Sequence, residues 1–287
     1  MAVFLILLVM IGAILSSTSK IADNSDRTNN SAQEARQVLD RIGLDLNGMI
    51  IRPDMDQLVS KLTPGNDKMV FYSLVSGYTG TTVLAAAKSP MSLIGYRINT
   101  NAAAAPVLQR LDQGLTWEGT NSLAYLTFPA RTSVTGTVTP SSSSQIPGMW
   151  DTTWTGTTTA TAPYWHQVGS QVFRFEVCYQ LQNGTMTTNC PGYSSPGSIT
   201  NTAAIVVAIA ILDSKTRKLI TTQAQWTSLI TALSDPTDSD LSQNPPVLMD
   251  TTWNNALQSS TFPFPAAIAS HIKVYQRWYY LNAPKFQ

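Results

Sequence analysis

The distribution of apolar residues is most distinctive at the N-terminus. Residues 1–15 read MAVFLILLVMIGAIL, a run without a charge, a hydroxyl or an amide. Apolar or small residues then recur mostly at spacings of three and four, while charged residues occupy other faces, which predicts an amphipathic helix. Pro53 does not fit a helix interior and should end it. We expect one helix over about residues 1–51. Few apolar residues occur over residues 23–31, so the helix should be solvated or locally loosened there.

Such a helix is too long for the rest of the chain to cover. At about 1.5 Å per residue, 50 residues extend roughly 75 Å. The apolar run alone is about 22 Å long and falls short of the ~20 residues that a bilayer core requires. It must pack against lipid or against other copies. A secretory signal peptide is the alternative interpretation, but the first positive charge, Lys20, follows the apolar run instead of preceding it.

The remaining residues predict a β-rich head. Alternation in QVFRFEVCY (residues 171–179) is typical of a half-buried antiparallel strand. AAIVVAIAIL (residues 203–212) is apolar on both faces and predicts a central strand beneath the long helix. The fold class is therefore α+β, a long N-terminal helix (residues 1–52) packed on an antiparallel β-rich head (residues 53–287). Further strands are expected at residues 69–75, 93–98, 107–111 and 272–281, and short helices at 222–233 and 252–257.

Composition and motifs exclude several classes of function. Only 12% of the residues are charged and the formal net charge is +1, so the phosphate-driven affinity of nucleic-acid-binding proteins has no source. The sequence contains no nucleophile elbow, phosphate-binding loop, dinucleotide motif or zinc-protease motif. His166 and His271 are its two histidines, and lone histidines are more often structural than catalytic. We expect a protein that is not an enzyme and does not bind nucleic acid.

The stretch MAVFLILLVMIGAILSS with its amphipathic continuation resembles the N-terminal segment of type IV pilins and pseudopilins. In those families the apolar half-helix lies in the membrane and then in the filament core. The Gly-Phe cleavage motif and the glutamate at the fifth mature position are not in this sequence, and we expect the mature helix to begin about six residues before Met1, which would bring the apolar span to about 20 residues. The helix residues assigned to assembly are Val3, Leu5, Leu8, Met10 and Leu15.

The resemblance implies that the partner of the chain is a second copy of itself. It implies a subunit held in the inner membrane before assembly and located in an extracellular or cell-surface filament afterwards. Two further stretches are more specific. GYRI with VLQRLD (residues 95–98 and 107–112) is similar to a strand pair of J-type minor pseudopilins of type II secretion. IVVAIAILD and VYQRWYYLN (residues 205–213 and 274–282) resemble the Verru/Chthon cassette protein C family of prepilin-like proteins.

Two alternatives to a bulk filament subunit stay open. One is a minor pseudopilin that caps or primes a secretion pseudopilus. The other comes from the hydroxyl-rich residues 132–161, near Trp150, Trp154 and Trp165. Either these tryptophans pin a surface loop to the head, or their exposed rings bind sugars and the protein is a membrane-anchored glycan-binding module. A simple anchor does not need an amphipathic continuation after Ser19, which favours assembly.

The two cysteines suggest a disulfide. Cys178 and Cys190 flank Asn183-Gly184, a strong hairpin signal that would bring the sulfurs together. In an exported protein we expect them to be bonded to each other.

One cluster of carboxylates raises the question of a bound cation. Asp235, Asp238 and Asp240 lie within six residues, and carboxylate oxygens are the ligands that Ca²⁺ prefers. Such clusters are more often solvated turns. A Ca²⁺ site is one alternative for these residues, and no other cofactor is expected.

Overall fold

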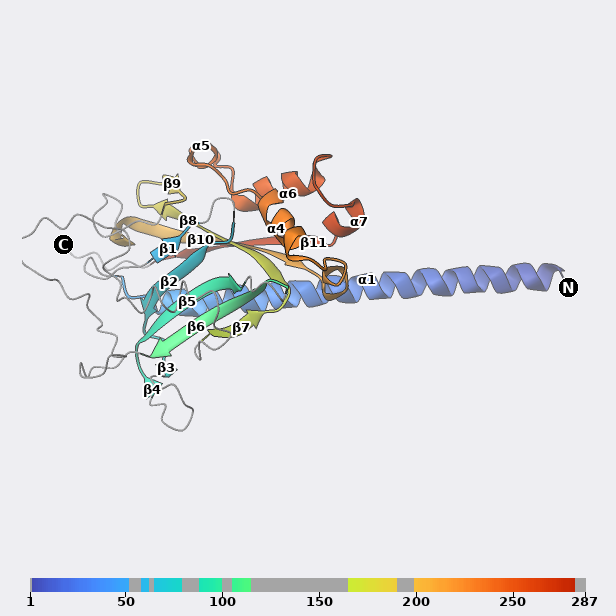
Figure 1. The fold of residues 1–287 in the computed structure, drawn as a ribbon, viewed down its shortest axis with the longest axis horizontal. Helices are drawn as coiled ribbons and strands as arrows, with labels where there is room; N and C mark the ends of the chain where they lie inside the picture. The colour runs from blue at the N-terminus through green and yellow to red at the C-terminus, as the bar shows by residue number, and fades with distance from the viewer. Residues whose placement is uncertain are drawn as a thin grey trace, which may run out of the picture.

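The chain folds into one long helix that carries a head built from two β-sheets and a layer of short helices (Figure 1). The computed structural model describes residues 2–51, 58–61, 65–78, 88–99, 105–114, 165–189 and 199–281. The fold class is α+β, as the sequence predicts.

Helix α1 (Ala2–Asn47) is continuous, without a break over residues 23–31. It ends four residues earlier than expected, because the chain turns at Gly48 to join the first sheet. The Leu74 amide donates to the Gly48 carbonyl (2.8 Å), and a Cβ at Gly48 would lie 2.7 Å from Ser73 Oγ. A larger residue would have to displace the Ser73 hydroxyl, which donates to the Asp45 carbonyl (2.9 Å). The N-terminal half of α1 projects away from the head, and its C-terminal half lies along it (Figure 1).

The first sheet, sheet A, contains the early strands of the head. Its order is β1-β2-β5-β6-β3-β4, with β7 also paired to β6. All pairs are antiparallel except β3 with β6. The strands expected at residues 69–75, 93–98 and 107–111 are confirmed, with ends shifted by up to three residues. The strands are β1 (Leu58–Ser60), β2 (Lys68–Ser73), β3 (Gly77–Tyr78), β4 (Lys88–Ser89), β5 (Ser92–Asn99), β6 (Val107–Gly114) and β7 (Trp165–Gly169).

Sheet B has the order β11-β10-β8-β9 and is antiparallel throughout. Its central strand β10 is buried on both faces, as its unbroken apolar sequence predicts. One face, with Ile205 and Val207, packs towards α1 and sheet A. The other, with Val206 and Leu212, packs against the short helices. The elements are β8 (Val172–Leu181), β9 (Met186–Thr187), the 3-10 turn η1 (Ile199–Asn201), β10 (Thr202–Leu212) and β11 (Ile272–Tyr280).

The expectation that β8 is half-buried is wrong. Its alternating residues Arg174 and Glu176 are fully buried, because the short helices cover the face on which they lie. Trp226 and Trp253 of this layer are themselves buried. The helices expected at residues 222–233 and 252–257 are confirmed as α4 and α6. The layer contains α3 (Ser214–Arg217), α4 (Gln223–Ala232), α5 (Asp238–Leu241), α6 (Met249–Gln258) and α7 (Ala266–Ala269).

The C-terminal half of α1 is fixed to the head by an apolar stripe and one buried ion pair. The stripe consists of Ala35, Val38, Leu39, Ile42 and Leu46, at spacings of one, three and four residues. Next to it lies a carboxylate, Asp45, which is completely buried. It accepts two hydrogen bonds from the Arg110 guanidinium of β6 (2.6 and 3.0 Å) and one from the Tyr96 hydroxyl of β5.

The environment of Asp45 changes the titration of its partners. Burial and the neighbouring carboxylate raise the pKa of Tyr96 well above its usual value. Although burial acts in the other direction, the bonds to Asp45 raise the pKa of Arg110. Both groups therefore keep their protons, and the helix is tied to sheet A by charge-assisted hydrogen bonds.

Removing the charge of Asp45 should loosen the helix from the head. Asp45→Asn removes the buried carboxylate of this ion pair and leaves the Arg110 cation with the partly exposed Asp112 (3.0 Å) as its counter-charge. Breaking a buried ion pair costs about 3 to 5 kcal/mol. We expect a loss of that order in the free energy of unfolding, measured with urea on the full chain in mild detergent. Asp40→Asn is the matched control, because Asp40 is 62% exposed and its pair with Arg277 should contribute at most about 1 kcal/mol. Equal losses in the two variants would contradict this account.

Candidate functional site

The N-terminal half of α1 carries a set of large apolar side chains that the head does not cover. Each is between 51% and 67% exposed. Scattered single apolar residues are normal on a surface, but a continuous apolar group indicates a partner or an interface. The exposed residues are Phe4, Met10, Ile11, Ile14, Leu15 and Ile21.

The five residues assigned to assembly from the sequence all lie on this helix. Met10 and Leu15 are exposed members of the apolar group. For Val3, Leu5 and Leu8 the structure describes the helical backbone, and their side chains lie outside the described residues. Among the described residues, no helix has both the length and the apolar content needed to cross a membrane.

Among the described side chains of α1, Asp23 is the one nearest the N-terminus that pairs with the head. The Lys215 ammonium of α3 donates to both carboxylate oxygens of Asp23 (2.6 Å each), and Arg27 pairs with the same carboxylate one turn along the helix. The hydrogen bond from Lys215, followed by that from Arg27, lowers the pKa of Asp23. The first buried residue of α1 beyond this point is Ser31, whose hydroxyl donates to Gln171 Oε1 (2.9 Å). The exposed apolar group thus lies entirely on the N-terminal side of the contact with the head.

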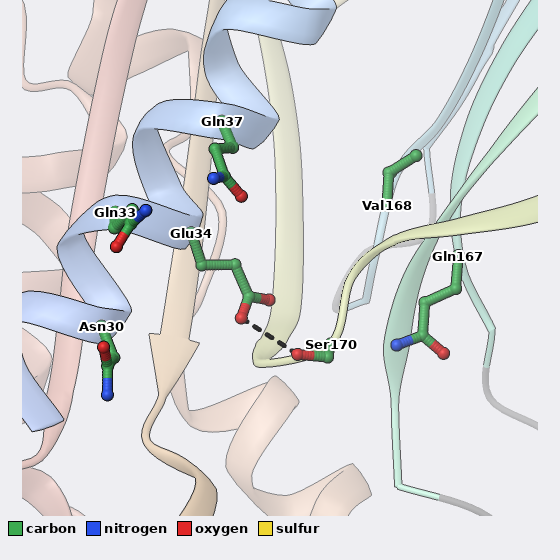
Figure 2. A pocket seen from close by; sticks show the side chains of 7 residues that line it. All are labelled: Asn30, Gln33, Glu34, Gln37, Gln167, Val168 and Ser170. Atoms are coloured by element: carbon green, nitrogen blue, oxygen red, sulfur yellow. Dashed lines mark hydrogen bonds between the residues drawn. The ribbon is translucent and has the colours of Figure 1, made fainter.

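A polar pocket of about 330 Å³ lies where α1 leaves the head. Figure 2 shows side chains from one face of α1 opposite the turn between β7 and β8. Glu34 accepts hydrogen bonds from the Ser170 hydroxyl (3.0 Å) and the Gln171 amide (2.6 Å), so its carboxylate serves as a tie between helix and head. The pocket contains one carboxylate and no histidine, cysteine or lysine, and we assign it no catalytic chemistry. It is lined by Asn30, Gln33, Glu34, Gln37, Gln167, Val168 and Ser170.

The disulfide expected between Cys178 and Cys190 gains no support. Cys178 is a free thiol buried in β8, and its sulfur lies 3.3 Å from Met249 Sδ of α6. Burial, with a smaller effect from neighbouring carboxylates, raises the pKa of Cys178 to about 12. Cys190 lies outside the described residues. Asn183 and Gly184 form the expected tight turn, with Gly184 at a φ of +85°.

The three aspartates considered for Ca²⁺ do not form one site. Asp235 pairs with the buried Arg174 guanidinium, and Asp240 caps α5 by accepting from Thr237. Asp238 accepts from the amide and hydroxyl of Thr188 (3.3 and 3.1 Å). In the described part of the chain, no group of three or more His, Cys, Asp or Glu residues is placed to hold a metal ion.

Both histidines lie beside an aspartate, and His271 Nδ1 is 3.4 Å from Asp213 Oδ2. His166 is exposed, and its Nε2 lies 3.3 Å from Asp112 Oδ1. The Arg97 guanidinium stacks on the Trp165 ring, 4.0 Å from its centroid. One face of Trp165 is therefore covered by Arg97. Trp150 and Trp154 lie outside the described residues.

Neither a protein-family profile nor a curated protein matches the chain. The expected membership in the Verru/Chthon cassette protein C family therefore gains no support. Among solved structures, the chain is similar to a type IV-like pilin from Thermus thermophilus, with 14% sequence identity and a TM-score of 0.37. The similarity covers 88% of this chain and 95% of that one.

The position of Cys178 predicts an unreactive thiol. With a pKa near 12 it has almost no thiolate at pH 8, and its sulfur is buried. We expect iodoacetamide to leave Cys178 unmodified in the folded chain and to alkylate it fully in denaturant without reductant, as measured by peptide mass spectrometry. A Cys178–Cys190 linked peptide in the unreduced digest would overturn the free thiol and restore the expectation from the sequence.

Proposed function

We propose that this chain is a structural subunit of a pilus-like or pseudopilus-like filament that assembles through its N-terminal helix. The observation that carries the proposal is the exposed apolar group on the projecting half of α1. The part of α1 that follows this group is helical without a break up to the residues that pack on the head. A single rigid helix therefore links the apolar end to the folded domain.

Burial against other copies is what stabilises such an assembly. Removing a large apolar side chain from water contributes about 1.5 to 3 kcal/mol. Six such side chains are exposed among the described residues of the N-terminal half of α1. Parallel helices from neighbouring copies would bury them together, while the heads, attached at the other end of each helix, would form the outer surface. The partner in this proposal is thus a second copy of the same chain.

Before assembly, the same apolar surface would lie in the inner membrane. The proposal includes prepilin-type processing and methylation of the N-terminus, and a filament outside the cell after export. These steps follow from the resemblance of the N-terminal residues to type IV pilins. No described feature favours a minor pseudopilin over a bulk subunit, and the covered ring of Trp165 gives no reason to prefer a glycan-binding module.

A charge on the projecting helix should prevent assembly. In Leu15→Asp the carboxylate would lie in a dry interface without a partner, where an ionised group is strongly unfavourable, and in the bilayer centre an aspartate costs about 2.5 to 3.5 kcal/mol. We expect the variant to lose fibres, as measured by electron microscopy of the material sheared from its native cells.

Leu219→Asp is the matched control, because Leu219 is 63% exposed and Leu15 is 66% exposed, but Leu219 lies on the head. We expect this variant to form fibres like the unmodified chain. Fibres of normal abundance in Leu15→Asp would refute assembly through this helix. Cells that never form fibres, together with glycan binding by the detergent-solubilised chain, would favour the membrane-anchored binding module.

A further inference from the structure

Five ionisable side chains meet inside the head, where sheet A, sheet B and the helical layer join. Two come from the ends of the β1–β2 connection, two from β8, and one from the segment after α4. Three of them, Asp67, Arg174 and Glu176, are completely buried. The group, which we call the buried charge cluster, consists of Lys61, Asp67, Arg174, Glu176 and Asp235.

The hydrogen-bond donors of the two cations have partners within the head. The Lys61 ammonium donates to Asp67 Oδ2 (2.5 Å), to Glu176 Oε1 (2.6 Å) and to the Val177 carbonyl, which uses its three protons. The Arg174 guanidinium pairs with Asp235 and donates to backbone carbonyls, among them that of Leu233 (3.2 Å). It also lies over the Trp253 ring, 5.2 Å from the centroid.

The carboxylates are less well matched. Three carboxylates face two cations, which would leave one uncompensated negative charge in a closed space if all were ionised. Asp67 Oδ1 is buried without a hydrogen-bond partner among the described residues. Glu176 Oε2 is also buried and accepts no hydrogen bond there, although it lies 3.2 Å from the Arg174 guanidinium in an ion pair. Burying such acceptors unpaired is unfavourable. A single added proton would convert one of them into a donor and would remove the excess charge.

We propose that the buried charge cluster holds one extra proton up to about neutral pH, shared between the carboxyl groups of Glu176 and Asp67. The proton fastens the β1–β2 connection of sheet A to β8 of sheet B. Loss of the proton at higher pH leaves two opposed carboxylates at this joint and weakens the head. This inference concerns the head alone and is independent of the filament proposal.

The surroundings of each of the three carboxyl groups raise its pKa. Burial, followed by the charge of Asp67, raises the pKa of Glu176 to about 7. Burial raises the pKa of Asp67, and burial followed by the charge of Glu176 raises that of Asp235 to about 6. The cations Lys61 and Arg174 oppose these shifts without cancelling them. Cys178, two residues after Glu176 in β8, stays neutral because its pKa is raised to about 12.

The sign of the effect follows from these directions. A carboxyl whose pKa is higher in the folded state than in the unfolded chain stabilises the fold only while it is protonated. The ordinary value for Glu176 is 4.5 and the folded value is about 7. Its contribution is therefore complete below about pH 4.5, is lost as the pH rises to about 7, and changes no further above that.

The test compares Glu176→Gln with the unmodified full chain in mild detergent. Glutamine has the shape of the protonated carboxyl and cannot ionise, so it should remove the pH dependence of the cluster. Between pH 5 and pH 8 we expect the unfolding equilibrium constant, from urea titrations, to rise on the order of 50-fold more in the unmodified chain than in the variant. Asp26→Asn, at an exposed position of α1, should keep the pH dependence of the unmodified chain.

A second measurement detects the proton directly. At pH 6 the infrared spectrum of the unmodified chain should contain the carbonyl band of a protonated carboxylic acid, shifted in heavy water and absent from Glu176→Gln. If that variant fails to fold, Asp67→Asn removes the other member of the pair and should flatten the same pH dependence. Parallel pH dependence in the unmodified chain and the cluster variants, or an unchanged infrared band in Glu176→Gln, would overturn the proposal.

Discussion

The attachment of the helix to the head along only part of its length is the constraint on which the other features depend. An α-helix rises about 1.5 Å per residue, so the 46 residues of α1 extend roughly 70 Å. Among the described side chains, the contacts that fix the helix to the head begin at Asp23, and the apolar stripe of the helix ends at Leu46. The large apolar side chains described before that contact are exposed. The apolar surface of the first turns is therefore available to another molecule.

The joint resists bending because apolar and polar contacts act on the same stretch of helix. Ile42 and Leu46 are buried against the sheets, and between them Asp45 accepts from Arg110 and Tyr96 on adjacent strands. Gly48 then allows the chain to pass close to Ser73 and enter sheet A. Nearer the N-terminus, Glu34 ties the helix to the turn before β8 by accepting from the Gln171 amide. A force on the projecting end would be transmitted to both sheets.

The head itself is organised around strand β10, which is covered on both faces. This burial leaves β8, its neighbour in sheet B, enclosed as well, and Arg174 and Glu176 are buried as a consequence. Each of these two charges has a partner from another part of the head. Glu176 pairs with Lys61 of the β1–β2 connection, and Arg174 pairs with Asp235, after α4, and lies over the Trp253 ring of α6. The same arrangement places Cys178 next to Met249.

Local sequence determined the parts of this protein that depend on neighbours within a few residues. The spacing of apolar residues predicts α1, the unbroken run from Ala203 to Leu212 predicts the central strand, and both are present. Only the tertiary structure decided what covers each face. Alternation in β8 shows that Arg174 and Phe175 point to opposite sides, but the helices that bury Arg174 come more than 40 residues later. A local pattern carries no record of such distant contacts, which is why the buried charge cluster and the free Cys178 were not predicted from the sequence.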